Sequence, residues 1–307
     1  MVENVIVLRC SLCKSENPPD NRCSSCKVAR YCNKEHQASD WAAHKTVCTP
    51  IKRARAKLEK EELKLRNDAG NGIFSPPYTF ENKVGHFWGI LSTRDYMRAR
   101  IDYVIKVLRL DTYDAVSTGL ECLRDMLHLC RSDNLGARDM IPGCYLRLEQ
   151  DQKCYDFIKW YATEGSRGDY SYGNMNLPFL NLENEDVMEG VAVFCGEWKA
   201  ADYGIPITLI KVRMLLDLRD LRASSALLET GKLNFDTIQH LRARLHSRSS
   251  IWSARPDLLS IEGLDERIKM LEDQTEQLFK AVWKANEYFW EAILDPRPFS
   301  EIPSTYS

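Results

Sequence analysis

Apolar residues recur at intervals of three and four from about residue 92 onward, which is the spacing of one face of an α-helix. The longest stripe runs through Leu264–Leu294, where the steps alternate between four and three until Asp295-Pro296 ends the pattern. It predicts a long closing helix packed on the body, with a coiled-coil dimer as the alternative. The stripe consists of Leu264, Ile268, Leu271, Thr275, Leu278, Val282, Ala285 and Phe289.

The rest of this region follows the same helical spacing. A stripe between Val116 and Cys130 predicts one helix, and another is expected near Val187. Residues 164–186 and Ser247–Gly263 lack the spacing and predict loops. No strand-like alternation follows residue 80, so the body is predicted to be all-α. Further helices are predicted at Leu135–Leu148, Cys154–Ala162, Ile205–Leu221 and Ile238–Leu245.

Four segments follow from these patterns and from the residues before them. Opposite charges four residues apart predict a charged, solvated helix at residues 51–66, and Gly, Asn and Pro residues favour a linker at 67–91. Residues 1–50 form the first segment and 92–307 an all-α helical domain. The helix pairs of this domain faintly resemble tetratricopeptide-type repeats, although no period of about 34 residues appears.

The composition predicts a globular intracellular protein, cytoplasmic or nuclear. Hydrophobic residues make up 44% of the 307 positions and charged residues 28%, which is enough apolar material for a core. No apolar run reaches the roughly 18 residues of a membrane helix, and Val5–Leu8 is too short for a signal peptide. The charge is uneven, because residues 9–66 hold 14 Lys and Arg against 7 Asp and Glu in a chain of net charge −2.

Cysteines cluster at the N-terminus, where six of the eleven lie between Cys10 and Cys48. In a reducing compartment such a cluster indicates metal binding sooner than disulfides. Two Cys-x2-Cys pairs are followed by a Cys-x3-His and a His-x3-Cys pair, and a four-residue step places two side chains on one face of a helix. Four pairs supply eight ligands, enough for two tetrahedral zinc ions. The pairs are Cys10/Cys13, Cys23/Cys26, Cys32/His36 and His44/Cys48.

The order of these pairs, with Gln37 and Trp41 between the last two, resembles the MYND zinc finger over about 40 residues. The resemblance implies interleaved ligands, with Cys10, Cys13, Cys32 and His36 on one zinc ion and Cys23, Cys26, His44 and Cys48 on the other. Spacing alone also permits consecutive pairing. At the position of His36 the family usually has cysteine, so the first site carries one negative charge fewer, and we expect it to bind zinc more weakly.

Four protein ligands leave no open position on either ion, so both zinc ions are expected to be structural. The resemblance implies a protein-interaction module that docks short, often proline-rich peptides beside the helix carrying Gln37 and Trp41. Gln37 would hydrogen-bond the peptide backbone and Trp41 would supply an apolar wall. In the alternative reading Trp41 fills the small core between the zinc sites.

The sequence offers two alternatives to this function. The basic surplus permits a nucleic-acid-associated factor, but no groove-reading helix signature or aromatic array accompanies it. A lysine methyltransferase of the SET class, in which MYND fingers also occur, would need a segment before the finger and an Asn-His pair, and only nine residues precede Cys10. Further catalytic motifs are missing, so we expect an adaptor or regulator and not an enzyme.

Overall fold

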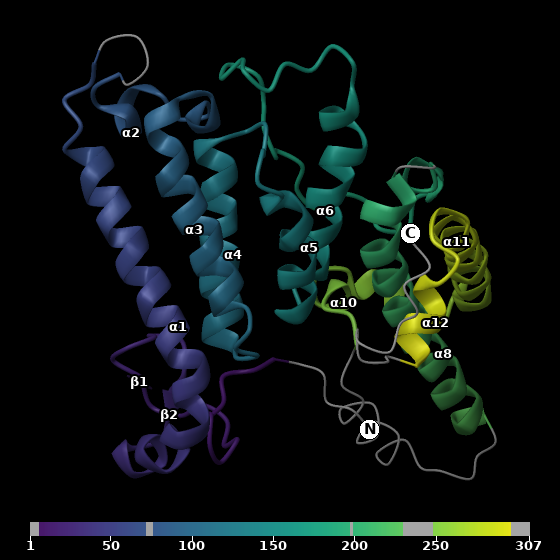
Figure 1. Cartoon of the computed structure of the whole chain (residues 1–307). Helices are drawn as coiled ribbons and strands as arrows, with labels where there is room; N and C mark the ends of the chain where they lie inside the picture. Colours follow the sequence, from purple (N-terminus) through teal and green to yellow (C-terminus); the bar gives the residue numbers. More distant parts are fainter. Residues whose placement is uncertain (1–5, 72–75, 197–198, 230–247, 296–307) are drawn as a thin grey trace. The chain divides into compact units, whose positions relative to one another are not determined.

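The computed structural model describes residues 6–71, 76–196, 199–229 and 248–295 (Figure 1). The chain forms two compact units. Unit 1 comprises residues 1–150 and 169–180, and unit 2 comprises residues 151–168 and 181–307. The predicted helical domain at 92–307 is therefore divided between the two units. None of the helices described is long and apolar enough to cross a membrane.

Unit 1 begins with a small hairpin and one long helix. Strands β1 (Asn21–Arg22) and β2 (Arg30–Tyr31) pair antiparallel, and α1 follows as Lys34–Arg66. Helix α1 passes through Pro50, so the boundary predicted at residue 50 lies inside a helix. Proline removes one helical hydrogen bond. Burial of Cys48, Ile51 and Ala54 on one face of α1 offsets that loss.

The remaining helices of unit 1 pack in chain order beside α1. Helix α3 (Arg94–Val107) packs on α1 and on α4 (Tyr113–Leu129), and α4 packs on α5 (Ala137–Arg147) (Figure 1). The predicted linker at 67–91 contains the short α2 (Thr79–Asn82) and 3-10 turns. Among the described residues, the only strands longer than a single bridge are those of the finger, which confirms the prediction of a finger followed by a helical body.

Unit 2 is built around α8 (Ile205–Glu229) and α11 (Leu264–Ala285), which pack against each other. Its other α-helices within the described residues are α6 (Asp151–Ala162), α10 (Ile251–Ala254) and α12 (Phe289–Leu294). The predicted stripe is the buried face of α11, so the closing-helix prediction is confirmed and the stripe is used within the chain. Its buried members are Leu264, Ile268, Leu271, Leu278 and Val282.

Two helix predictions in unit 2 were wrong in part. The closing helix ends at Ala285, because Asn286 is extended and its side chain accepts a hydrogen bond from the backbone N–H of Tyr288 at 3.1 Å. The chain near Val187 forms only a 3-10 turn, at Ala192–Phe194. The predicted helix at Ile238–Leu245 lies outside the described residues.

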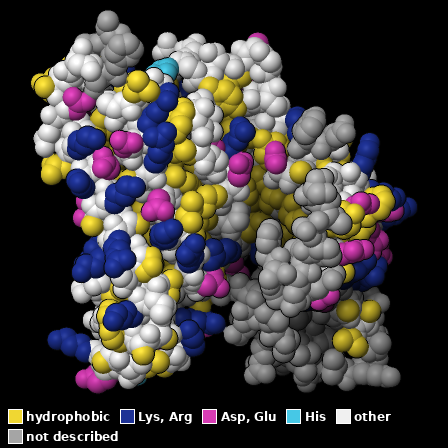
Figure 2. All heavy atoms as spheres, in the orientation of Figure 1, with side chains coloured by type: hydrophobic (Ala, Val, Ile, Leu, Met, Phe, Trp, Pro, Cys, Tyr) yellow, Lys and Arg dark blue, Asp and Glu magenta, His cyan; other side chains and the backbone are white. Residues whose placement is uncertain are grey.

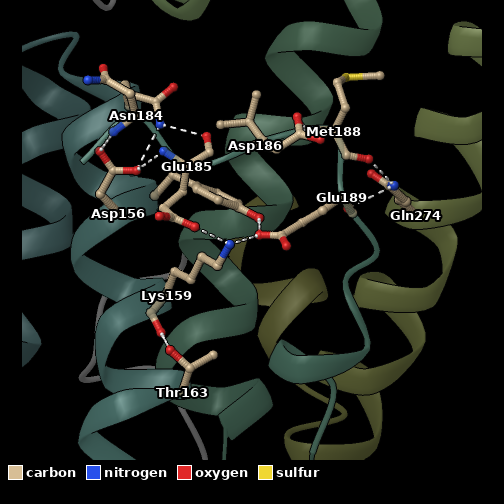
Figure 3. A network of polar contacts seen from close by, with 12 residues as sticks. Asp156, Lys159, Thr163, Asn184, Glu185, Asp186, Met188, Glu189 and Gln274 are labelled. Carbon is tan, nitrogen blue, oxygen red and sulfur yellow. Dashed lines mark hydrogen bonds and ion pairs between the residues drawn. The ribbon is translucent and has the colours of Figure 1, made fainter. Parts of the chain in front are cut away.

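Polar side chains of α6 explain why the chain near Val187 is irregular (Figure 3). The Asp156 carboxylate accepts hydrogen bonds from the backbone N–H groups of Asn184 and Glu185 at 2.9 and 3.0 Å. Lys159 Nζ lies 2.6 Å from Glu189 Oε1. Backbone groups that bond to side chains in this way are not available for a helix.

The other side of the same segment is held by α8 and α11. Gln274 on α11 donates from Nε2 to the carbonyl oxygens of Met188 and Glu189, at 3.0 Å each (Figure 3). Its Oε1 accepts from Lys211 Nζ of α8 at 2.7 Å, and the same amine donates to the carbonyl oxygen of Val187. Lys211 is fully buried, and burial lowers its pKa to about 8.

Candidate metal centres

Two similar turns carry the first ligands of the finger. In each Cys-x2-Cys pair, the residue after the second cysteine donates its N–H to the carbonyl oxygen of the first: Lys14 to Cys10 at 3.0 Å and Lys27 to Cys23 at 2.9 Å. Both lysines have positive φ, 59° and 67°. This tight backbone directs both thiols of a pair to one side, as a shared metal ion requires.

Helix α1 supplies the histidines and the last cysteine. The Asn33 side chain caps α1 by accepting a hydrogen bond from the N–H of His36 at 2.8 Å, which places His36 in the first turn, close to Cys32. His44 and Cys48 lie one turn apart on the buried face of the same helix. One capped helix therefore carries ligands for two sites.

The structure brings the eight ligands together in the interleaved arrangement. Within each group of four, the ligand atoms all lie within 4.8 Å of one another. Site 1 is partly open to solvent, whereas all four residues of site 2 are buried. Site 1 consists of Cys10, Cys13, Cys32 and His36, and site 2 of Cys23, Cys26, His44 and Cys48.

The distances between ligand atoms fit a tetrahedral zinc ion. Zinc–sulfur bonds of about 2.3 Å and zinc–nitrogen bonds of about 2.0–2.1 Å imply edges of about 3.8 Å between sulfurs and about 3.6 Å between sulfur and nitrogen. The sulfur–sulfur distances are 3.6 Å for Cys13–Cys32 and 3.7 Å for Cys23–Cys48. The distances to the histidine nitrogens are 3.5 Å, from Cys10 to Nδ1 of His36 and from Cys26 to Nε2 of His44.

Electrostatics also fit a cation at both sites. Burial raises the pKa of the Cys10 thiol, but hydrogen bonds from the Cys13 backbone and the His36 ring outweigh it and bring that pKa down to about 6. Burial and neighbouring thiolates raise the pKa of Cys32 to about 11 and of Cys48 to about 12. A divalent ion removes that repulsion, because it neutralises the clustered thiolates. Burial lowers the pKa of His44, which favours the neutral imidazole that binds metal.

The two aromatic residues of the motif have different positions. Tyr31 is fully buried in the finger, where its hydroxyl donates to Asp40 Oδ2 at 2.7 Å and its ring meets His44 edge-on. Trp41 contacts His44 at a ring distance of 6.3 Å but remains 41% exposed. Gln37, one turn earlier on α1, is half-buried. The buried aromatic of the finger is thus Tyr31, and Trp41 presents a ring to solvent.

The finger shares its core with the helices of unit 1. Val28, Tyr31 and Ile51 form one apolar cluster with Tyr103 of α3 and Ala115 of α4. A segment of about 40 residues buries little apolar surface alone, so this contact adds to what zinc binding contributes. The finger is therefore part of the core of unit 1 and not a separately packed module.

A buried ion pair reinforces this junction. Arg30 of β2 donates from Nε and Nη2 to the two carboxylate oxygens of Asp114 in α4, at 2.9 Å each. Thr112, the N-cap of α4, also donates to the carbonyl oxygen of Val28 at 2.7 Å. These contacts join residues 84 positions apart in the chain. No sequence pattern indicated the Arg30–Asp114 pair, because no motif includes Asp114.

Among the described residues, the remaining cysteines and histidines do not join the metal sites. Cys130, Cys144 and Cys154 are buried, whereas Cys122 and Cys195 are half-buried. His86 and His128 are exposed, and His240 and His246 lie outside the described residues.

Comparison with known proteins places the finger in a family. The MYND finger family matches residues 10–48. The chain is 37% identical over 68 residues to a Rho GTPase-activating protein of Dictyostelium discoideum, covering 22% of this chain and 6% of that protein. It is 45% identical over 48 residues to Tudor domain-containing protein 1 of Mus musculus, covering 16% and 4%.

A third relative is SET domain and MYND-type zinc finger protein 6 of Schizosaccharomyces pombe, 37% identical over 46 residues, covering 15% of this chain and 10% of that protein. The chain thus spans a tenth or less of each of these three relatives. No solved structure matches the chain. The ligand geometry and the family match therefore agree that residues 10–48 of this protein form a MYND finger, which is a zinc-binding protein-interaction domain.

Proposed function

We propose that this protein is an adaptor or regulator whose MYND finger docks a short, extended and often proline-rich peptide of a partner protein beside α1. The observation that carries the proposal is the exposed ring of Trp41, held on a helix that the metal ligands His36 and His44 anchor on both sides. Large exposed aromatic side chains on rigid supports are typical anchors of peptide binding.

Trp41 and Gln37 have distinct roles in the proposed binding. Trp41 offers an apolar wall, and the amide of Gln37, half-buried one turn earlier, offers a donor and an acceptor to the peptide backbone. Proline-rich peptides suit such a site because their extended conformation is largely formed before binding and costs little entropy. Both zinc ions have a full set of protein ligands, so zinc holds the site in shape and activates no water.

The test is a peptide-display selection on the zinc-loaded full chain, since the finger shares its core with α3 and α4. Random and proline-rich libraries are selected against the wild type and Trp41→Ala. The matched control is Trp283→Ala, which removes a tryptophan that is 53% exposed on α11 in unit 2.

We expect a proline-containing motif to be enriched on the wild type and on Trp283→Ala, and to be lost on Trp41→Ala and after chelation. A chain with two zinc ions bound that selects no peptide contradicts the proposal. Peptides that bind Trp41→Ala as well as the wild type contradict it too, because the peptide site would then lie elsewhere.

A further inference from the structure

Helix α1 continues about five turns beyond the finger, and the first half of this extension carries only positive charge. Residues 41–58 include five Lys and Arg and no Asp or Glu. The first acid after this stretch, Glu59, lies 3.4 Å from Arg55. In Figure 2, Lys and Arg side chains are spread over the part of unit 1 where α1 runs.

Two of these cations continue a row that begins at Trp41, and a third lies next to the row. Lys45 lies four residues after Trp41, and Lys52 lies seven residues after Lys45, so Trp41, Lys45 and Lys52 share one helical face. Arg53 directly follows Lys52. All four side chains are exposed. Lys45, Lys52 and Arg53 make no ion pair within the part of the chain that the structure describes. We call Lys45, Lys52 and Arg53 the basic row.

We propose that the basic row extends the peptide site, and that the partner is a peptide whose docking segment is followed or preceded by acidic residues. The proposal rests on the function proposed above, because the row is continuous with Trp41. An acidic segment is the complement of this surface, since the cations lack carboxylate partners of their own.

The geometry fixes where the acids should lie. Helix α1 rises about 1.5 Å per residue, so Lys45 is about 6 Å and Lys52 about 16 Å beyond Trp41. An extended peptide advances about 3.3 Å per residue. Acidic residues are therefore expected about two and about five positions from the residue that contacts Trp41, on one side of it.

A nucleic acid is less well matched to this surface. Stable phosphate binding commonly uses some six to ten contacts. The row offers three cations, and α1 becomes mixed in charge from Glu59 onward, where Glu61 and Glu62 follow. A peptide with two or three acids next to an apolar anchor uses all that the row and Trp41 offer.

The test uses the zinc-loaded full chain and a peptide selected by display, synthesised with Glu, Ser or Lys at the two flanking positions. Binding is measured by fluorescence anisotropy at low and at high salt. K45E/K52E/R53E is compared with K269E/K280E/K284E, which reverses three exposed cations on α11 and changes the net charge equally. Zinc content and circular dichroism confirm that both variants are folded.

We expect the Glu-flanked peptide to bind the wild type roughly threefold more tightly than the Ser-flanked one at low salt, because each exposed charge pair contributes only modestly to affinity. K45E/K52E/R53E should lose this preference and favour the Lys-flanked peptide, and K269E/K280E/K284E should retain it. High salt should reduce the preference.

Three outcomes overturn the proposal. A peptide that depends on Trp41 but binds equally with all three flanks overturns the basic row and leaves the proposed function standing. A chain that selects no peptide overturns both. The third outcome is a single-stranded oligonucleotide that binds more tightly than the Glu-flanked peptide. If K45E/K52E/R53E abolishes its binding and Trp41→Ala does not, the row is assigned to nucleic acid.

Discussion

Asp114→Asn removes the charge that holds the finger against α4 while keeping the shape of the side chain. In the wild type, Arg30 makes two hydrogen bonds of 2.9 Å to this carboxylate, and Arg22 Nη2 lies 3.3 Å from it. The Arg30 and Asp114 side chains are 9% and 7% exposed. The variant leaves Arg30 with only Asp20, whose side chain is 70% exposed, as a negatively charged partner.

Breaking one side of a buried pair costs about 3–5 kcal/mol, because the remaining charge stays desolvated. Since Asp20 compensates in part, we expect Asp114→Asn to lower the free energy of unfolding of unit 1 by about 3 kcal/mol. The control is Asp111→Asn. Asp111 lies three residues away in the sequence and pairs with Arg147, but its side chain is 77% exposed, so the expected cost is below about 1 kcal/mol.

The assay is urea unfolding of the zinc-loaded full chain, followed by circular dichroism and by zinc release to a chromophoric chelator. If the finger and α4 form one cooperative structure, Asp114→Asn should lower the midpoints of both signals together. A variant that matches Asp111→Asn in stability, or that shifts the helical signal while zinc release stays at the wild-type midpoint, would refute the reasoning.

Three further predictions concern the zinc sites and unit 2. Zinc should leave in two phases when a chelator is added, because Cys13 of site 1 is exposed whereas site 2 is buried; one phase that releases both ions would contradict this. Leu278→Ala should lower the free energy of unfolding of unit 2 by about 3 kcal/mol, because it opens a cavity beneath the buried face of α11. Met270→Ala, which removes a side chain that is 43% exposed, should cost less than about 1 kcal/mol. Equal costs in urea unfolding would contradict the burial argument. Because burial lowers the pKa of Lys211, keeping its amine charged in the folded protein costs most below a pH of about 8. The free energy of unfolding of the wild type, relative to that of Lys211→Met, should therefore rise by about 2–3 kcal/mol as the pH rises from 8 toward 10. A difference in urea unfolding that does not change with pH would refute this.

Much of the zinc site could be predicted because its ligands lie close together in the chain. The pairs at Cys10 and Cys23 are set by tight turns, and those at Cys32 and His44 by single helical turns. Local spacing did not choose between consecutive and interleaved pairing. The hairpin β1–β2 and the start of α1 decide it, because they place Cys32 and His36 beside the first turn and His44 and Cys48 beside the second.

Helices with strong apolar stripes could also be predicted, but their ends could not. The stripe of α11 was read correctly from Leu264 to Val282, since burial of one face has a regular period. The end at Ala285 depends on a local hydrogen bond of Asn286, and the irregular segment near Val187 on partners in α6 and α11. The hydrogen bond of Asn286 lies outside the apolar pattern, and the partners in α6 and α11 are distant in the sequence, so neither leaves a periodic trace.

The sequence by itself determined that two zinc ions bind at residues 10–48 and that the body is helical, because ligand spacing and apolar period are local properties. Only the tertiary structure decided that the finger is part of unit 1. Arg30 and Asp114 are distant in sequence and belong to no common motif, and their contact exists only once α1, α3 and α4 have packed. The same packing leaves Trp41 and the basic row exposed on α1, beside the face that His44, Cys48 and Ile51 bury against the rest of unit 1.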